Sequence, residues 1–162
     1  RIEAIRPATI GESRPAVGGP DCLVAEGFLD IQVNGFAAVD FNRGELTAAD
    51  LTRATTAMWR SGVTQYLPVV ITAPVKNMLA TLAAIARARE ETPILRQAIP
   101  GIHLEGPFLS PDDGPRGAHP ADSVRDPDWD LFRRFQDAAG PCYPASLCRV
   151  AYFLAAFWRS RV

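Results

Sequence analysis

The chain has 162 residues, of which 48% are hydrophobic and 22% are charged, a composition that fits a folded domain and excludes a disordered chain. Seventeen Lys and Arg against eighteen Asp and Glu give a net charge of -1, which excludes the positive charge excess typical of nucleic-acid-binding proteins. The longest apolar run, Val150–Trp158, is much shorter than the ~20 residues that a membrane-spanning helix needs.

The cysteines and the first residue point to a cellular compartment. The three cysteines, Cys22, Cys142 and Cys148, are odd in number, and the last two lack the C-x-x-C spacing of zinc ribbons. We therefore expect a reduced, cytoplasmic protein rather than a disulfide-bonded secreted one. The chain begins with Arg1 and has no signal-peptide pattern, so we expect its natural start to lie upstream.

The first part of the chain predicts strands followed by a helix. Residues 1–26 hold short apolar fragments broken by glycine and proline, which is typical of small strands and turns at the edge of a β-domain. Phe28–Val33 alternates apolar and polar residues, which predicts a strand that runs into a turn at Asn34-Gly35. Thr47 followed by Asp50 has the capping-box pattern and predicts a helix from Ala48 to Ser61.

Strands and helices are expected to alternate along the next part of the chain. Val63–Ile71 is rich in β-branched and aromatic residues and predicts a buried strand despite Pro68. The following elements are a helix starting near Pro74 and ended by Pro93, a strand over Ile99–Leu104, a proline-rich loop from Gly106 to Pro127 and a helix over Trp129–Ala138. The apolar face of the first of these helices would consist of Val75, Leu79, Leu82, Ala83, Ile85 and Ala86. This alternation predicts an α/β protein with parallel strands.

The last residues differ in character from the rest. From Gly140 to Val162 there is no acidic residue, and two of the three cysteines fall there. One interpretation is a hydrophobic terminal helix, Leu147–Trp158, packed on the body of the protein. The interpretation we favour is that residues 141–162 are an atypical tail, out of frame or otherwise foreign to the fold, because the alternation of strand and helix stops there. The other two reading frames of the DNA would distinguish these interpretations.

A carboxylate stands at the end of the third predicted strand. Period-two alternation places Ile102 and Leu104 on one face of the strand and His103 and Glu105 on the other. In parallel α/β sheets and barrels the carboxyl ends of the strands form the active face, where Glu105 could bind a metal. The alternative is that Glu105 caps a loop and His103 is a hydrogen-bonded core histidine.

Two further segments could line a pocket near that strand end. Gln32 and Asn34 lie two residues apart, where many metallohydrolases carry a His-x-His pair. Amide oxygens are weak zinc ligands, so we expect these side chains to line a pocket, with a turn and a polar layer as the alternative. Arg116–His119 could offer hydrogen-bond donors to a polar ligand, although a solvated loop is the simpler interpretation. The acids Asp112, Asp113 and Asp122 are expected to be exposed, because their spacing fits no calcium loop.

Five blocks, taken in order, resemble N-acetylglucosamine-6-phosphate deacetylases of the amidohydrolase superfamily. They are GFLDIQVNG, VDFN, YLPVVIT, GIHLEGPFLSP and GAHP, and the resemblance ends near Gly140. It implies that residues 27–140 form a truncated part of a metal-dependent-hydrolase (β/α)8 TIM barrel, and that residues 1–26 form part of a small β-sandwich domain. It also implies hydrolysis of N-acetylglucosamine-6-phosphate to glucosamine-6-phosphate and acetate in amino-sugar catabolism. The family commonly carries glycines where this chain has Phe36, Ala37 and Ala38, a difference that could alter the loop.

The resemblance also implies roles for individual residues. Glu105 matches the carboxylate metal ligand, Ala118 and His119 match the pair that contacts the sugar, and Gln32 and Asn34 match a branch whose amides replace His-x-His. That branch holds one divalent metal ion, for which zinc is our first expectation and iron or another divalent ion the alternative. Such a metal polarises the acetamide carbonyl and lowers the pKa of bound water toward ~7.

The same resemblance implies that this chain lacks part of the machinery. The remaining histidine ligands and the general-base aspartate lie downstream in the family, so no catalytic residue is expected here. The expected partner is a sugar phosphate, with no nucleic acid or membrane, and the parent enzyme is expected to be a homodimer. Two alternatives stay open. One is another amidohydrolase, similar to dihydroorotase or hydantoinase, which deacetylase turnover by the full gene product would exclude. The other is a non-catalytic α/β fragment that binds a sugar phosphate.

Overall fold

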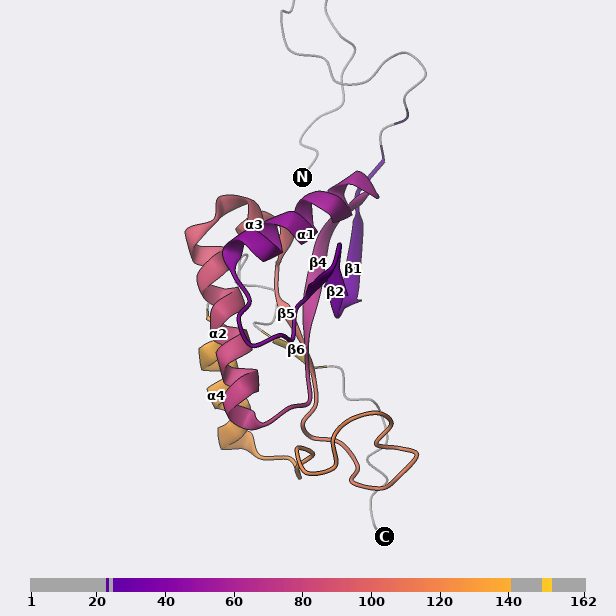
Figure 1. Ribbon diagram of the computed structural model, residues 1–162, viewed down its shortest axis with the longest axis vertical. Coiled ribbons are helices and arrows are strands. Elements are labelled where there is room, and N and C mark those ends of the chain that lie inside the picture. Colours follow the sequence, from indigo (N-terminus) through magenta and orange to yellow (C-terminus); the bar gives the residue numbers. More distant parts are fainter. Residues whose placement is uncertain (1–22, 24, 141–149, 153–162) are drawn as a thin grey trace, which may run out of the picture.

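The computed structural model describes residue 23, residues 25–140 and the backbone of residues 150–152 (Figure 1). Almost all of the β-domain expected over residues 1–26 lies outside the described residues, as do all three cysteines. Within the described part of the chain, no helix is long and apolar enough to cross a membrane.

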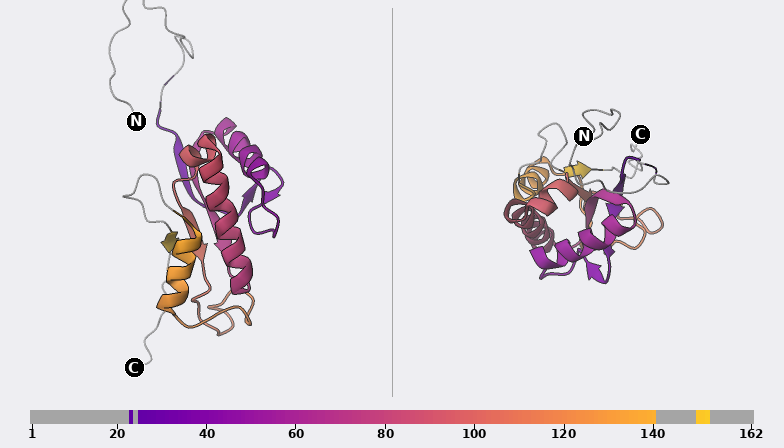
Figure 2. Two further views of the ribbon diagram at one scale, coloured as in Figure 1. Left: turned by 90° about the vertical axis from the view of Figure 1, so that its left-hand side faces the viewer. Right: turned by 90° about the horizontal axis from the view of Figure 1, so that it is seen from above.

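The described residues form an α/β fold with one parallel sheet. In chain order the elements are β1 (Phe28–Val33), β2 (Gly35–Phe36), β3 (Val39–Asp40), α1 (Ala48–Arg60), β4 (Val63–Ile71), α2 (Val75–Glu91), α3 (Pro93–Ala98), β5 (Ile102–Glu105), α4 (Trp129–Ala138) and β6 (Val150–Tyr152). The parallel sheet has the order β1-β4-β5-β6, and β2 pairs antiparallel with β3. The helices lie together on one side of the strands (Figures 1 and 2).

Most of the elements expected from the sequence are present. The strands Phe28–Val33 and Val63–Ile71 and the helix Trp129–Ala138 have the predicted bounds, and the first helix ends at Arg60, one residue before the prediction. The segment between Glu105 and Trp129 contains no helix or strand, as expected of a proline-rich loop. The prediction of an α/β fold with parallel strands is confirmed.

One helix before β5 was not predicted, and the predicted start of the strand that follows it was wrong. Pro93 ends α2 as predicted, but it also begins α3, because proline is well tolerated in the first turn of a helix. The Ile99 amide then donates to the Leu95 carbonyl oxygen at 2.9 Å, which keeps Ile99 at the end of α3. The strand predicted over Ile99–Leu104 therefore begins only at Ile102.

The short strand β6 bears on the C-terminal tail. Val150–Tyr152 pairs in parallel with Ile102–Leu104 of β5. The terminal helix considered for residues 147–158 is therefore not formed at these three residues. The strand β6 after α4 continues the alternation of helix and strand, which we expected from the sequence to stop at the tail. The rest of the tail lies outside the described residues. The out-of-frame origin of the tail stays a prediction about the DNA.

A core fills the space between the helices and one face of the sheet. Tyr66 of β4 is fully buried, stacks on Phe41 at 5.8 Å between ring centroids, and places its hydroxyl 2.9 Å from the Thr55 hydroxyl of α1. Burial raises the pKa of Tyr66 to about 12. The face of α2 differs from the prediction at Ala83, which is exposed, whereas Met78 is buried. Other fully buried side chains are Phe135, Leu51, Met58, Leu82, Ile85, Leu95, Ile99, Ile102 and Leu104.

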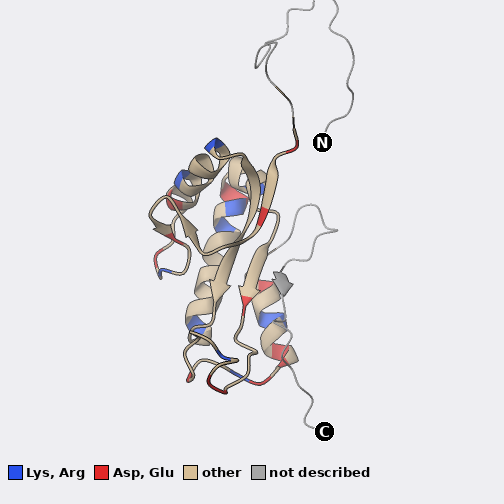
Figure 3. Ribbon diagram, turned by 90° about the vertical axis from the view of Figure 1, so that its right-hand side faces the viewer, with Lys and Arg blue, Asp and Glu red and all other residues tan. Residues whose placement is uncertain are grey.

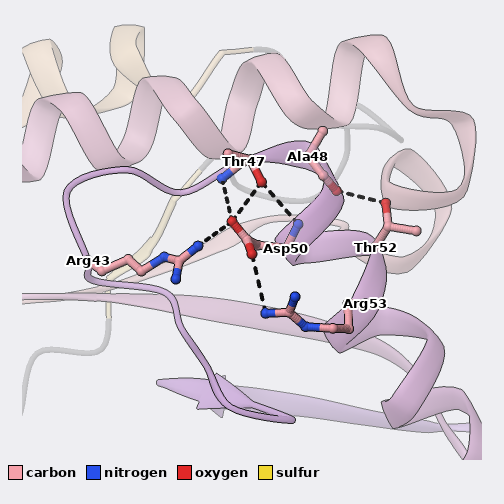
Figure 4. A network of polar contacts seen from close by, with 6 residues as sticks. All are labelled: Arg43, Thr47, Ala48, Asp50, Thr52 and Arg53. Atoms are coloured by element: carbon pink, nitrogen blue, oxygen red, sulfur yellow. Dashed lines mark hydrogen bonds and ion pairs between the residues drawn. The ribbon is translucent and has the colours of Figure 1, made fainter.

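The predicted capping box closes the amino end of α1 (Figure 4). The Thr47 hydroxyl accepts from the Asp50 amide at 3.2 Å and donates to the Asp50 carboxylate at 2.6 Å. Arg43 and Arg53 bind the same carboxylate. The Thr47 hydroxyl, with smaller contributions from the Thr47 amide and Arg43, lowers the pKa of Asp50 to about 2, against an opposing effect of burial. Helix capping therefore accounts for this polar cluster.

The Asp50 network predicts that the free energy of unfolding depends on pH. The folded-state pKa of about 2 lies below the ordinary 3.8, so the carboxylate stabilises the fold above pH ~4 and loses this effect as pH falls toward 2. We expect Asp50→Asn to lower the free energy of unfolding in urea at pH 6, and the gap to the unsubstituted chain to shrink at pH 2.5. Asp126→Asn, at an exposed loop position, is the control and should change little at either pH. A gap that stays constant between the two pH values would contradict the prediction.

The hairpin formed by β2 and β3 has an unusual turn. Its two central residues, Ala37 and Ala38, have φ angles of 50° and 59°. Two-residue hairpin loops with positive φ at both positions favour glycine or asparagine, because a Cβ is strained there. The bend at Asn34 is present, but Gly35 belongs to β2, so the tight turn lies three residues later than the sequence predicts.

Glycine should relieve the strain in this turn. We expect Ala38→Gly to raise the free energy of unfolding by about 0.5–1 kcal/mol, since a left-handed non-glycine residue costs about 1–2 kcal/mol and glycine gives part of this back as entropy. Ala80→Gly, at an exposed helical position, should instead lower it by about 1 kcal/mol. Urea unfolding of the two variants checks this pair, and a loss of stability in Ala38→Gly would contradict the strain argument.

Candidate functional site at the strand ends

Three polar side chains meet at the carboxyl ends of the strands. Glu105, the last residue of β5, receives a hydrogen bond from Gln32 Nε2 of β1 on Oε2 at 3.4 Å. His119 Nε2, from the loop after β5, lies 3.4 Å from the other carboxylate oxygen, Oε1. The Glu105 side chain is 30% exposed, so its oxygens can be reached from solvent. The structure thus brings together three of the residues that the sequence singled out.

The alternation of β5 explains where Glu105 points. Ile102 and Leu104 belong to the core on the helix side of the sheet. His103 and Glu105 contact β1 residues on the opposite face, with His103 Nδ1 2.9 Å from the Ile31 carbonyl oxygen. The predicted division of the strand into two faces is confirmed. His103 is 4% exposed and hydrogen-bonded, as the alternative interpretation of this residue expected.

The sheet is strongly curved at this place. β4 lies between β1 and β5, and two strand spacings in a flat sheet amount to roughly 9.5 Å. Hydrogen bonds nevertheless join β1 to β5 through Gln32 and His103. The sheet must therefore curl toward the face that carries Glu105, and the helices lie on its convex side. Curvature of this kind gathers side chains of non-neighbouring strands into one site.

Thr72 and Gly106 fix the backbone of Glu105. The buried Thr72, just after β4, donates from Oγ1 to the Glu105 carbonyl oxygen at 3.1 Å. Gly106 follows with a φ of 90°, and a Cβ built there would lie 1.9 Å from Thr72 Oγ1. Both the backbone angle and the close approach require glycine at this position. The sequence showed Gly106 as a strand breaker, but the contact with Thr72 had no local signal.

The loop after β5 carries His119 back toward the site. Arg116 donates from Nη1 to the His119 carbonyl oxygen at 2.7 Å and pairs with Asp113. Ala118 is exposed beside His119, and its predicted contact with a sugar stays a prediction. The three loop aspartates are exposed, as expected. Figure 3 shows acidic and basic residues of the described chain spread over helices and loops.

Asn34 is the site residue for which the structure gives least support. The chain bends after β1, and the Asn34 carbonyl oxygen accepts from the Phe41 amide at 3.0 Å. The Asn34 side chain is exposed, and no hydrogen bond joins it to Glu105 among the described residues. Of the two amides, Gln32 alone contacts the carboxylate in this part of the chain. Their role in lining a pocket stays a prediction.

Among the described side chains of this site, Glu105 is suited to bind a metal ion as one ligand. Within residues 25–140 its two oxygens have long contacts of 3.4 Å, which leave lone pairs available. Among the described residues, however, no group of three His, Cys, Asp or Glu side chains could hold a metal ion. A catalytic zinc site needs about three protein ligands. Further ligands would have to come from outside the described residues.

Comparison with known proteins gives the relatives of this chain. No family model matches it. The N-acetylglucosamine-6-phosphate deacetylase of Bacillus subtilis is 32% identical over 122 residues, which are 74% of this chain and 30% of that enzyme. The human N-acetylglucosamine-6-phosphate deacetylase is 31% identical over 137 residues, 80% of this chain and 32% of that enzyme. The N-acetylgalactosamine-6-phosphate deacetylase of a Shewanella species is 39% identical over 116 residues, 69% of this chain and 27% of that enzyme.

Solved structures agree with the sequence comparison. The N-acetylglucosamine-6-phosphate deacetylase of Pasteurella multocida matches with a TM-score of 0.60 and 28% identity, over 70% of this chain and 28% of that one. The enzyme of Mycobacterium smegmatis matches with a TM-score of 0.59 and 28% identity, over 76% of this chain and 35% of that one. The chain thus spans about a third or less of the length of these relatives. It is homologous to the N-acetylglucosamine-6-phosphate deacetylases and corresponds to roughly the first 30% of their length.

Proposed function

We propose that this chain is the N-terminal portion of a metal-dependent hydrolase that deacetylates an N-acetylhexosamine-6-phosphate, with N-acetylglucosamine-6-phosphate as the first candidate. The observation that carries the proposal is the Glu105 carboxylate at the end of β5, held between Gln32 and His119. The curled parallel sheet with helices on its convex side is what part of a (β/α)8 barrel would look like. Homology of this chain to N-acetylglucosamine-6-phosphate deacetylases, over 74% of its length in the Bacillus subtilis enzyme, supports the same activity.

Each of the three side chains has a distinct role in this proposal. Glu105 would be one ligand of a divalent metal ion, zinc or another, which supplies a Lewis acid for the amide carbonyl. The Gln32 amide donates to Oε2 and fixes the rotation of the carboxylate, leaving Oε1 toward the loop. His119 lies partly exposed beside Oε1, where its ring can donate to or accept from a sugar hydroxyl.

The proposal includes what this chain would not do by itself. Because the described residues offer no set of three metal ligands, we expect the isolated chain to bind zinc weakly and to release no acetate from the substrate. The full product of the gene is expected to supply the missing ligands and the general base.

A second candidate substrate is N-acetylgalactosamine-6-phosphate. The observation that favours it is the Shewanella relative, which is 39% identical to this chain, compared with 32% for the Bacillus subtilis enzyme. The two sugars differ in the configuration of one hydroxyl, and the chemistry at the acetamide is the same.

An acetate-release assay tests the proposal. The full gene product, loaded with zinc or iron, is assayed with both hexosamine phosphates and with unphosphorylated N-acetylglucosamine, and this chain is assayed in parallel. We expect turnover of one phosphorylated sugar by the full product and none by this chain. Failure of the metal-loaded full product to hydrolyse either hexosamine phosphate would overturn the proposal, whether or not it hydrolyses the unphosphorylated sugar. Turnover by this chain that is lost in Glu105→Ala would overturn the expectation that it is incomplete.

A further inference from the structure

His103 makes a contact that the proposed chemistry does not use. Its side chain is 4% exposed, and Nδ1 lies 2.9 Å from the Ile31 carbonyl oxygen, 72 residues away in sequence. A carbonyl oxygen can only accept, so Nδ1 carries the proton and donates. The bond joins β5 to β1 across the intervening β4. It therefore belongs to no sheet ladder.

The strand that receives this bond is irregular at the same place. In the pairing of β1 with β4, Asp30 lies opposite Tyr66, and Val33 lies opposite Pro68. Three steps along β1 thus match two steps along β4, which leaves one extra residue in β1, as in a β-bulge. Pro68 has no amide hydrogen to give to this stretch. Ile31 lies within the irregular segment, and His103 supplies a hydrogen bond to its carbonyl oxygen from the far side of β4.

The residue after Ile31 is the one that reaches Glu105. Gln32 Nε2 donates to Glu105 Oε2 at 3.4 Å. Two residues on one face of β5, His103 and Glu105, therefore hold two consecutive residues of β1, one through the backbone and the other through the side chain. Without the His103 bond, the extra residue in β1 could shift, and the Gln32 amide would move with it.

We propose that His103 is a positioning residue that fixes the irregular end of β1 through the Ile31 carbonyl and so holds the Gln32 amide against the Glu105 carboxylate. The contact geometry is independent of the proposed function, and only the consequence for catalysis rests on it. The alternative is that His103 merely fills space in the interior of the curved sheet.

Three substitutions separate these roles. Asparagine carries a donor nitrogen on Cγ, where Nδ1 stands in histidine, whereas leucine has nearly the same shape and no donor. Glutamine moves the donor one bond further out. We therefore compare His103→Asn, His103→Leu and His103→Gln in this chain, and Gln65, whose Nε2 donates to the Gln97 carbonyl oxygen at 3.2 Å, serves as an internal reference.

Nitrogen-15 NMR of this chain is the primary measurement. In the unsubstituted chain we expect a proton on His103 Nδ1. His103→Asn should leave the Gln32 side-chain amide resonances in place, and His103→Leu and His103→Gln should move them toward free glutamine, with Gln65 unchanged in all. The proposal is overturned if His103→Leu leaves the Gln32 resonances in place. It is also overturned if His103→Asn and His103→Leu shift these resonances equally. Should the leucine variant fail to fold, the Asn and Gln pair decides between the roles by the same criterion.

Kinetics of the full gene product test the consequence. We expect His103→Leu to lower kcat by about 10–100-fold, the usual effect of losing a residue that orients a metal ligand, with KM little changed and His103→Asn recovering most of the loss. An equal loss in both variants would overturn the catalytic consequence. If the NMR outcome holds while the full product hydrolyses no hexosamine phosphate, the proposed function fails and the positioning role of His103 stands.

Discussion

Glu105→Gln in the full gene product is expected to remove the bound divalent metal and to lower kcat/KM for the hexosamine phosphate by about a thousandfold or more. A metal ion supplies several kcal/mol of transition-state stabilisation, and each ~1.4 kcal/mol is a factor of ten in rate. The substitution keeps the shape of the side chain and removes its charge, so packing at the end of β5 should be preserved. Metal content after dialysis and acetate release are the two measurements.

The control for this variant is Glu45→Gln, at an exposed position before α1. It removes the same charge without touching the strand ends, and both metal content and turnover should remain. A Glu105→Gln protein that keeps its metal and its rate would remove Glu105 from the proposed ligand set. Loss of turnover with full metal content would assign Glu105 to a different role.

Gly106→Ala is expected to lower the free energy of unfolding by about 2–5 kcal/mol. About 1–2 kcal/mol comes from placing a Cβ at a positive φ, and about 1–3 kcal/mol comes from overpacking against Thr72. The new Cβ would stand 1.9 Å from Thr72 Oγ1, so Thr72 must move and release the Glu105 carbonyl. Chemical denaturation measures the loss.

Gly114→Ala is a matched control for this clash. Gly114 has the same φ of 90°, but a Cβ there meets nothing within 4 Å. Only the backbone cost of about 1–2 kcal/mol should remain. The difference between the two variants therefore measures the contact with Thr72, and equal losses would mean that Thr72 yields without cost.

The elements that could be predicted from the sequence are those with a local cause. The capping box of Thr47 and Asp50, the faces of β5 and the bounds of β4 depend on residues within a few positions of one another. Pro93 was ambiguous because proline ends one helix and begins another by the same restriction of φ. The hairpin turn at Ala37 and Ala38 escaped prediction because alanine is no signal for a left-handed backbone.

The candidate site was predictable in its members and not in its geometry. Glu105, Gln32 and His119 each stood out through position and chemistry. Their meeting depends on the curl of the sheet and on the loop that Arg116 ties to His119. Neither cause is local, since the curl of the sheet involves the pairing of β1, β4 and β5, and Arg116 lies eleven residues after Glu105. For the same reason the irregular pairing of β1 and the role of His103 had no sequence signal.

The two bonds that join β1 to β5 also bear on how the protein folds. They close loops of 72 and 73 residues, whereas β4, α2, α3 and β5 follow one another closely along the chain. Closing a long loop costs conformational entropy before the contact that it allows can stabilise the chain. Contacts between residues far apart in sequence therefore slow folding. β1 pairs with β4 at a separation of 35 residues, Phe28 to Val63, and β4 pairs with β5 at 34 residues, Val69 to His103. Both pairings should therefore precede the two bonds that join β1 to β5. The carboxylate site then comes into being in the final step, so an intermediate can possess most of the helices and strands and still lack it.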